Sequence, residues 1–377
     1  MIFIPKELNP EETRVPIVPE TVKKLVKLGA EVFVEKCVGE RCGYFDKEYE
    51  EAGAKVVGRE EGLKSADIVM RLRKPPIEEI SLMKRGSLHI SYLEPFFDFA
   101  IQDKFIECGV NAIAMEMIPR TTLAQKMDAL SSQANLAGYV AVIVAASRLP
   151  MVFPMMMTPA GTIKPVRVFV IGCGVAGLQA IATAKRLGAR VEAFDTRPVV
   201  EEQVLSLGAK FVKIDVGPTG QTKDGYALEL TEEQKQKQRE GMKKVIAQSD
   251  VVITTAQVFG KKAPLLVTRD MIASMRPGSV IVDLASETGG NVEGSKPGQE
   301  TVIDGVIVIG ALNFPGRVAV HASQMYSSNL GNLIEHFWDK EKKMFNYNLN
   351  DEILDGCLVI YDGKLRNELI QKARSAQ

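Results

Sequence analysis

The sequence predicts an α/β fold with two Rossmann-like, doubly wound domains that contain parallel sheets. Three observations favour this fold. At 377 residues, the chain is too long for one ordinary hydrophobic core. Strand-like and helix-like segments alternate through most of the chain, as parallel sheets with flanking helices require. Two long apolar helix candidates, residues 129–148 and the segment that begins at Val318, are expected to link the domains around a cleft.

The first domain is predicted to be discontinuous and to contain residues 1–128 and 330–377. Helix candidates at residues 19–28 and 45–52 are each followed by glycine, a residue that commonly ends helices. Strands are expected at residues 3–4, 31–35, 68–72, 87–92 and 111–115, and the stretch 353–361 is expected to add another. No glycine-rich phosphate loop occurs here, so the main nucleotide site is expected elsewhere.

The second domain is predicted to contain residues 129–329, including the linker helices. Strands are expected at residues 167–171, 190–194, 210–213, 251–254, 279–283 and 306–309. A charged helix is expected at 231–248, after a long polar loop of the kind that is more often functional than accidental. The methionine-rich run 151–157 is interpreted as core filling rather than as an adaptable surface.

Composition excludes several classes of function. The 47 basic and 47 acidic residues give no net charge, which argues against bulk nucleic-acid binding. The most apolar stretch, residues 137–146, is too short to span a bilayer, and the N-terminus does not resemble a secretory signal, so a cytoplasmic location is expected. The five scattered cysteines favour neither a disulfide framework nor a metal site.

A dinucleotide-binding fingerprint follows the strand 167–171. Gly172, Gly174 and Gly177 fit the pattern G-x-G-x-x-G, with Val175 and Ala176 between the last two. The first glycine allows a tight turn, the second admits the pyrophosphate, and the third permits close packing of helix on strand. Backbone N–H groups at the start of the following helix then bind the phosphates. The pattern alone is weak, but its strand and helix context makes it a specific prediction.

Asp195 predicts the identity of the nucleotide. It ends the next strand and lies 195 − 177 = 18 residues after the last glycine, close to the ~20 expected of the acid that binds the adenosine ribose. A carboxylate there favours NAD(H) and repels a 2′-phosphate. Thr196 and Arg197 follow and are predicted to contact the same nucleotide. Arg197 leaves an alternative open, because a nearby arginine accommodates the phosphate of NADP in some sites.

The segment from Met115 to Arg148, together with the fingerprint, resembles the NAD(H)-binding component of proton-translocating nicotinamide nucleotide transhydrogenase. The resemblance covers essentially the whole chain and implies that Arg120, Gln125, Asp128 and Ser131 form a loop over the nicotinamide. The alternative for Asp128 and Ser131 is a cap on the helix that begins at residue 129. The resemblance also implies a mobile loop with Gly225 and the catalytic Tyr226, continued by the cofactor-binding Gln238.

The implied activity is direct hydride transfer from NADH on this chain to NADP⁺ on a partner, in a Re/Si-specific enzyme that translocates protons. The implied partners are an NADP(H)-binding beta subunit, a membrane-spanning component and a second copy of this chain in a homodimer. The subunit would then be peripheral on the inner face of the cell membrane, with no direct insertion. The chain's only histidines, His89, His321 and His336, lie in no catalytic motif, which suits transfer between two nicotinamides because that reaction needs no general base.

Alanine dehydrogenase is the alternative enzyme, because it shares the fold and many signatures. Arg14 and Lys74 match residues with which that family handles an amino or keto acid. The family's histidine is replaced by Glu94, whose carboxylate would repel pyruvate. A non-enzymatic NAD-sensing module is a second alternative, which the loop from Arg120 to Ser131 disfavours.

Overall fold

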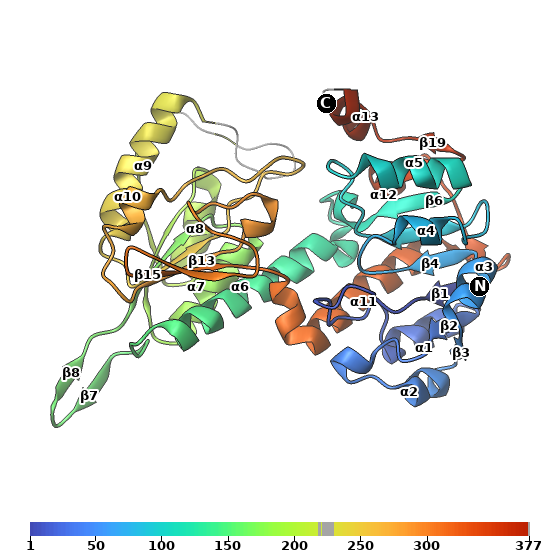
Figure 1. Cartoon of the computed structure of the whole chain (residues 1–377), viewed down its shortest axis with the longest axis horizontal. Coiled ribbons are helices and arrows are strands. Elements are labelled where there is room, and N and C mark those ends of the chain that lie inside the picture. Colours follow the sequence, from blue (N-terminus) through green and yellow to red (C-terminus); the bar gives the residue numbers. More distant parts are fainter. Residues whose placement is uncertain (218–219, 221–229, 376–377) are drawn as a thin grey trace. The chain divides into compact units, whose positions relative to one another are not determined.

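The structure is a computed structural model that describes residues 1–217, 220 and 230–375. It divides into two compact units, residues 1–133 with 316–377 and residues 134–315 (Figure 1). We call them unit 1 and unit 2. The prediction from the sequence placed the divisions after residues 128 and 329.

Unit 1 is built on an eight-stranded sheet. Its strands are β1 (Ile2–Ile4), β2 (Val32–Glu35), β3 (Lys55–Val57), β4 (Ile68–Met70), β5 (Leu88–Ser91), β6 (Asn111–Ala114), β18 (Leu358–Tyr361) and β19 (Lys364–Leu365). The order is β19-β18-β6-β5-β4-β1-β2-β3. The strands from β3 to β6 are parallel, whereas β18 pairs antiparallel with both β6 and β19. The sheet is thus parallel over most of its width, as expected from the sequence, and has an antiparallel edge at β18 and β19.

The helices of unit 1 are α1 (Pro19–Lys27), α2 (Asp46–Glu51), α3 (Arg59–Ser65), α4 (Ile77–Ile80), α5 (Phe99–Cys108), α11 (Ala319–Phe337), α12 (Glu352–Cys357) and α13 (Glu368–Ser375). Helix α12 corrects the prediction of one strand over 353–361. The Asp351 side chain accepts hydrogen bonds from the backbone N–H groups of Ile353 (2.9 Å) and Leu354 (3.4 Å). This cap satisfies donors at the first turn, so the apolar run begins as a helix and becomes a strand only at Leu358.

Unit 2 contains a seven-stranded sheet, which confirms a second Rossmann-like domain. Its strands are β9 (Arg167–Ile171), β10 (Arg190–Phe194), β11 (Lys210–Phe211), β12 (Val251–Thr254), β13 (Val280–Asp283), β14 (Glu300–Ile303) and β15 (Val306–Gly310). The order β11-β10-β9-β12-β13-β15-β14 reverses direction between β9 and β12. All neighbours are parallel except β14 and β15, which form an antiparallel edge. Ligands of such sheets bind beyond the carboxyl ends of the strands at this reversal.

Helices α7 (Val175–Arg186), α8 (Glu201–Ser206), α9 (Glu232–Ile246) and α10 (Arg269–Ile272) belong to unit 2. Met242 and Ile246 of α9 are fully buried and share a core cluster with Phe169 of β9 and Val252 of β12. The apolar side of α9 therefore explains how so charged a segment folds onto the sheet.

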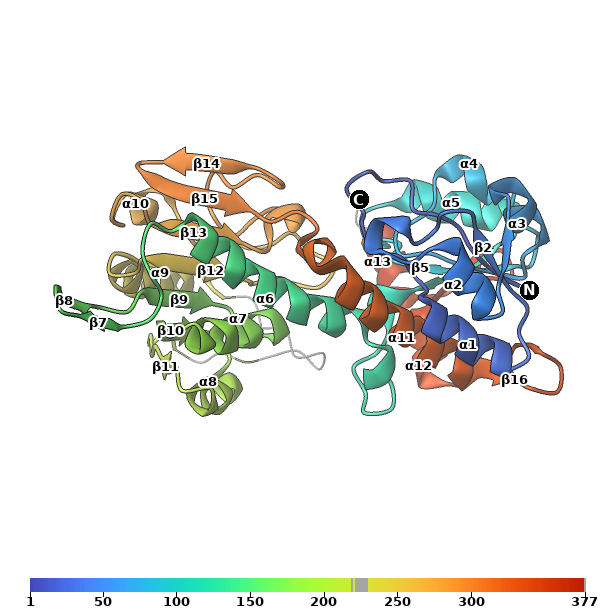
Figure 2. The same ribbon diagram turned by 90° about the horizontal axis from the view of Figure 1, so that it is seen from below.

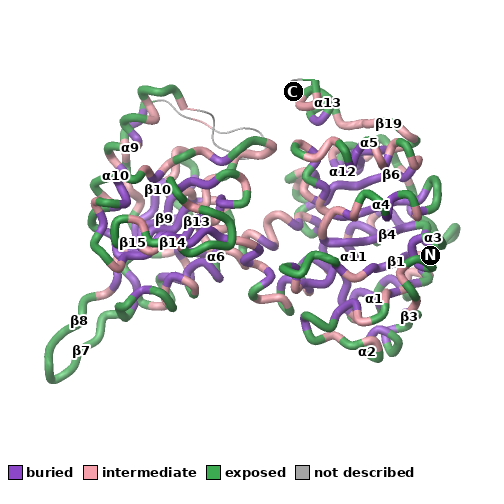
Figure 3. The backbone as a smooth tube through the Cα atoms, viewed as in Figure 1, coloured by how far each residue is buried: buried purple, intermediate pink, exposed green. Residues whose placement is uncertain are grey.

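A hairpin of β7 (Met156–Thr158) and β8 (Gly161–Ile163) projects from unit 2 with an exposed surface (Figure 3). Met155, Met156 and Met157 are 60%, 43% and 78% exposed. The interpretation of these methionines as core filling is therefore wrong. Among the described residues, no further strand pairs with this two-stranded hairpin, and its methionine side chains stay exposed.

Helix α6 (Ala129–Arg148) is long and apolar enough, by length and composition, to cross a membrane. In the structure, 44% of its most apolar 18-residue window is buried, and the core helix of a folded domain meets the same criterion. The stretch 137–146, judged too short in the sequence, is the middle of this longer helix.

Candidate functional site

The fingerprint forms the expected strand, turn and helix. Strand β9 ends at Ile171, Gly172 adopts the left-handed φ of +93°, and α7 begins at Val175 with Gly174 as its N-cap. The Gly172 N–H donates to the Phe194 carbonyl (2.9 Å), which ties the turn to the neighbouring strand β10. The unpaired N–H groups of the 12-residue helix α7 therefore lie at the carboxyl edge of the sheet, where anions bind.

The three glycines meet different surroundings. A Cβ on Gly177 would lie 1.9 Å from the Gly172 carbonyl oxygen, and one on Gly172 would lie 2.7 Å from Thr255 Oγ1. A Cβ on Gly174 would meet no atom within 4 Å. Gly172 and Gly177 are thus required by packing, whereas Gly174 faces open space. These are the residues and the space that a pyrophosphate needs, so the site fits the predicted nucleotide.

Helix α6 supplies a support for α7 that sequence reasoning missed. A Cβ on Gly138 would lie 2.1 Å from the Ala176 carbonyl oxygen, so α6 and the first turn of α7 are in contact (Figure 2). Only a residue without a side chain allows this approach. The sequence of α6 does not indicate which of its residues lies closest to α7. The contact at Gly138 is visible only in the structure.

The Asp195 carboxylate already accepts four hydrogen bonds. Its Oδ2 accepts from the Cys173 N–H (2.7 Å) and from Arg197 Nη2 (2.7 Å). Its Oδ1 accepts from the backbone N–H (2.9 Å) and from Nε (2.9 Å) of Arg197. The hydrogen bond that the Arg197 side chain donates to Asp195 raises the pKa of Arg197, and neighbouring Thr196 is half-buried. The predicted ribose acid therefore lies beside the fingerprint, with the arginine paired to it.

Asn291 and Asp283 hold the loop that follows β12, on the other side of the reversal in strand order. Asn291 is fully buried; its Oδ1 accepts from the Ala256 N–H (3.0 Å), and its Nδ2 donates to the carbonyls of Ala256 and Pro264 (2.8 Å each). Asp283 Oδ2 in turn accepts from the Asn291 N–H (3.0 Å). Thr255 in this loop donates to the Gly172 carbonyl (2.9 Å), so the network positions one wall of the fingerprint turn.

The segment from Arg120 to Ser131 lies in unit 1, where two short turns connect β6 to α6. Gln125 starts a 3₁₀ turn (Gln125–Met127), and both Arg120 and Gln125 are exposed. Helix α11 anchors this turn, since Asn329 and Asn332 donate to the Lys126 carbonyl at 3.0 and 2.9 Å.

Asp128 and Ser131 form a cap on α6, which was the alternative to a cofactor-binding role for these two residues. Asp128 accepts from the backbone N–H (2.9 Å) and from the hydroxyl (2.6 Å) of Ser131. The carboxylate thus satisfies a donor in the first turn of α6. Capping does not exclude a cofactor contact, because both side chains are only half-buried.

Of the remaining residues predicted for the site, some are described by the structure and others are not. Val175 is 37% exposed at the start of α7, and Gln238 is buried on α9, with Nε2 4.0 Å from the Met242 sulfur. Gly225 and Tyr226 lie outside the described residues. Among the described residues, no three His, Cys, Asp or Glu side chains are grouped so that they could hold a metal ion.

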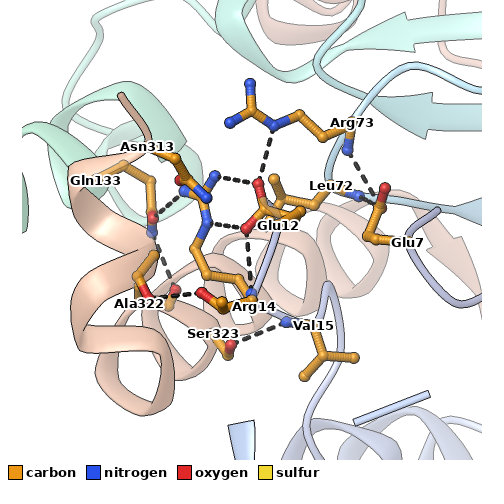
Figure 4. A network of polar contacts seen from close by, with 12 residues as sticks. Glu7, Glu12, Arg14, Val15, Leu72, Arg73, Gln133, Asn313, Ala322 and Ser323 are labelled. Carbon is orange, nitrogen blue, oxygen red and sulfur yellow. Dashed lines mark hydrogen bonds and ion pairs between the residues drawn. The ribbon is translucent and has the colours of Figure 1, made fainter. Parts of the chain in front are cut away.

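A buried ion network occupies unit 1 around Glu12 (Figure 4). Glu12 accepts from Nε and Nη2 of Arg14 (2.7 Å each) and from Arg73 Nε (2.9 Å), and its side chain has no exposed surface. Burial opposes ionisation, but hydrogen bonds and the charges of Arg14 and Arg73 outweigh it and lower the pKa of Glu12 to about 2. Gln133 accepts from Arg14 Nη1 (2.7 Å), so the guanidinium is held from both sides.

Lys74, the second residue shared with alanine dehydrogenase, is also paired. Its ammonium group donates to Glu94 (2.6 Å) and Asp98 (2.7 Å). Glu94 is held in a left-handed conformation (φ 52°), and its N–H donates to Glu116 (2.7 Å). Burial raises the pKa of Glu116 to about 7, a perturbation that sequence reasoning had no means to find.

Comparison with known proteins identifies the family. Residues 3–137 match the N-terminal domain, and residues 141–368 the C-terminal domain, of the family described as alanine dehydrogenase/PNT. The chain belongs to the alanine dehydrogenase/PNT family. Within this family, it is 45% identical over 372 residues to an NAD(P) transhydrogenase alpha-subunit chain of Rhodospirillum rubrum, with 97% of each chain covered.

Two further relatives represent the two kinds of enzyme in the family. The crystal structure of transhydrogenase from Sinorhizobium meliloti superposes with a TM-score of 0.85 at 42% identity, covering 98% of this chain and 99% of that chain. Alanine dehydrogenase of Halomonas elongata is 28% identical over 383 residues, covering 99% of this chain and 96% of the relative. The expected resemblance and the two-domain α/β fold are thereby confirmed.

Proposed function

We propose that this chain is the NAD(H)-binding subunit of a proton-translocating, Re/Si-specific NAD(P) transhydrogenase. The observation that carries the proposal is the fingerprint turn with an acidic residue at the end of β10, in a chain that is 45% identical to a transhydrogenase subunit. The NADP(H) would be held by a beta subunit, and a membrane-spanning component would couple the reaction to proton movement. In this proposal, the subunit is peripheral on the inner face of the membrane, without insertion of its own.

The residues have distinct tasks in this proposal. The N–H groups at the start of α7 bind the pyrophosphate, and Gly174 leaves room for it. Asp195 accepts from the adenosine ribose. Bound NADH supplies the hydride, so the chain itself needs only to orient the ring and exclude water. Arg120, Gln125, Asp128 and Ser131 are assigned to the orientation of the nicotinamide, and Tyr226 and Gln238 to the closure over the nucleotide.

Alanine dehydrogenation is disfavoured by the pairing of the cations that it would need. Arg14 Nε and Nη2 donate to Glu12, and Lys74 donates to Glu94 and Asp98. A keto acid would have to compete with these carboxylates for both cations. Identity to the alanine dehydrogenase of Halomonas elongata is also lower, at 28% against 45%.

The deciding experiment measures hydride transfer from NADH to an NADP⁺ analogue after addition of a purified NADP(H)-binding component. A parallel assay supplies NADH, pyruvate and ammonia. We expect turnover in the first assay alone. Turnover in the second alone would replace the proposal with amino-acid dehydrogenation, and NADH binding without turnover in either would favour a sensing module.

Asp128 variants separate capping from a role in hydride transfer. Asp128→Ala removes the cap and is expected to lower the stability of the helix by about 1 kcal/mol. Asp128→Asn keeps an acceptor for the Ser131 N–H but removes the charge and the acceptor for the Ser131 hydroxyl. We expect Asp128→Asn to keep the wild-type melting temperature and to slow hydride transfer at least about tenfold, because a small misplacement of the ring has effects of up to about 100-fold. Wild-type rates in Asp128→Asn would leave Asp128 as a cap alone.

We further propose a homodimer in which the β7–β8 hairpin is buried. Exposed methionines concentrate on this hairpin, and contiguous exposed apolar surface is typical of interaction sites. Met157→Asp is therefore expected to shift the protein toward monomer in sedimentation analysis. Met344→Asp, an equally apolar exposed position in unit 1, is the control. A dimer of unchanged stability in Met157→Asp would contradict this interface.

A further inference from the structure

The ion pair between Asp195 and Arg197 occupies the position that a ribose needs. An ionised carboxylate has about four acceptor positions, two on each oxygen. In Asp195, all of these are used, by the N–H groups of Cys173 and Arg197 and by Nε and Nη2 of Arg197. The side chains of Asp195 and Arg197 are largely buried, at 6% and 15% exposure respectively. A ribose hydroxyl therefore has no acceptor position left on this carboxylate.

The four donors are not equivalent. The two backbone N–H groups belong to the fingerprint turn and to the chain after β10, and they stay where the fold puts them. The guanidinium is at the end of a flexible side chain, so its displacement would leave the backbone in place. Two ribose hydroxyls could replace Nε and Nη2 without any change in the backbone.

We propose that Arg197 is a displaceable occupant of the adenosine ribose site, which NAD(H) must move, and that Asp195 excludes NADP(H) partly by holding this arginine. The inference rests on the proposed NAD(H) site. A 2′-phosphate would meet the Asp195 charge, and the nearby cation that could neutralise the phosphate is already committed to that carboxylate. Asp195 thus repels the phosphate directly and also binds Arg197, the cation that could otherwise pair with the phosphate.

The same ion pair gives opposite expectations for the two nucleotides. Removing the arginine relieves NADH of a competitor, although it also leaves the carboxylate less neutralised. Removing the carboxylate charge weakens the ribose contact, but it ends the repulsion and releases Arg197 for a phosphate. A general loss of structure would instead weaken both nucleotides together.

The test is a double-mutant cycle with Asp195→Asn, Arg197→Ala and the double variant, in the full chain, titrated with NADH and with NADPH. Asparagine is chosen because it keeps an acceptor for the Cys173 N–H. Arg197→Ala is expected to bind NADH about threefold tighter or more, because NADH no longer has to break charge-assisted hydrogen bonds to Asp195 and only part of this gain is offset. Arg186→Ala, an exposed arginine at the end of α7, is the charge-matched control.

Asp195→Asn is expected to weaken NADH binding and to strengthen NADPH binding at least about tenfold at low salt, with the gain falling as salt screens the phosphate. The double variant should lose that gain. Unchanged or weaker NADH binding in Arg197→Ala, no NADPH gain in Asp195→Asn, or a gain that persists in the double variant would each overturn the proposal. Absence of NADH binding in both the wild type and Arg197→Ala would overturn the NAD(H) site as well, which distinguishes the two failures.

Discussion

Replacement of Gly177 with alanine is expected to abolish detectable NADH binding and to destabilise unit 2 by about 3 kcal/mol or more, the upper part of the range for overpacked positions. The new Cβ would lie 1.9 Å from the Gly172 carbonyl oxygen. Both partners are backbone or rigidly attached to it, so no side-chain rotation relieves the clash. The start of α7 must move away from β9, and the N–H groups that bind the phosphates move with it.

Gly174→Ala is the matched control, because its Cβ would meet no protein atom within 4 Å and its φ of −77° suits any residue. We expect this variant to keep the wild-type melting temperature but to bind NADH more weakly, since the methyl group enters the space left for the pyrophosphate. Trp338, the chain's single tryptophan, lies in β16 (Trp338–Asp339) of unit 1, so its fluorescence should be unaffected by either variant. Circular dichroism and NADH titration complete the measurement. Normal NADH affinity in Gly177→Ala would refute the assigned packing role.

The second large effect is expected at Glu12. Glu12→Ala leaves Arg14 and Arg73 without their shared counterion, and the Arg14 side chain is only 4% exposed. Breaking a buried pair by removing one partner typically lowers stability by about 3–5 kcal/mol. We expect a loss of this size in unit 1, measured by urea unfolding followed through Trp338 fluorescence. Glu60→Ala, which removes an exposed pair with Lys64, is the control and should leave stability nearly unchanged.

The lowered pKa of Glu12 predicts the pH dependence of this effect. The pKa falls from its ordinary value of 4.5 to about 2 on folding, so the unfolded chain binds the proton more tightly. The stabilisation is therefore complete above pH 4.5 and is lost as the pH falls from 4.5 toward 2. Glu12→Gln should unfold with a shallower pH dependence than the wild type in this range. Parallel curves for the two proteins would show that Glu12 does not ionise as described.

The features that the sequence predicts correctly are those that are encoded within a few residues. The fingerprint turn depends on the backbone freedom of Gly172 and on the missing side chain of Gly177, and both properties follow directly from the residue type. Six of the seven strands of the unit 2 sheet lie where they were expected, with ends shifted by at most two residues, whereas β14 was not expected. The errors arose where residues outside the local pattern decide the structure: Asp351 caps a helix in a run that has the composition of a strand, and the methionines near Met157 lie on a two-stranded hairpin that stays exposed.

The predictions for the candidate site come from two different sources. Its glycines and its acidic residue were predicted from spacing, and the assignment of Arg120, Gln125, Asp128 and Ser131 came from family resemblance and stays a prediction.

The sequence by itself determined the two-domain α/β class, the fingerprint turn and the acid at the end of β10, because strand propensity, glycine conformation and short spacings act within a few residues. Only the tertiary structure decided that Gly138 supports α7, that Asn291 holds the loop after β12 and that Arg197 fills the acceptor positions of Asp195. These features depend on distances between atoms from separate elements or on the rotamer of a flexible side chain. Such distances are set when the whole core packs, and no local pattern of residues records them.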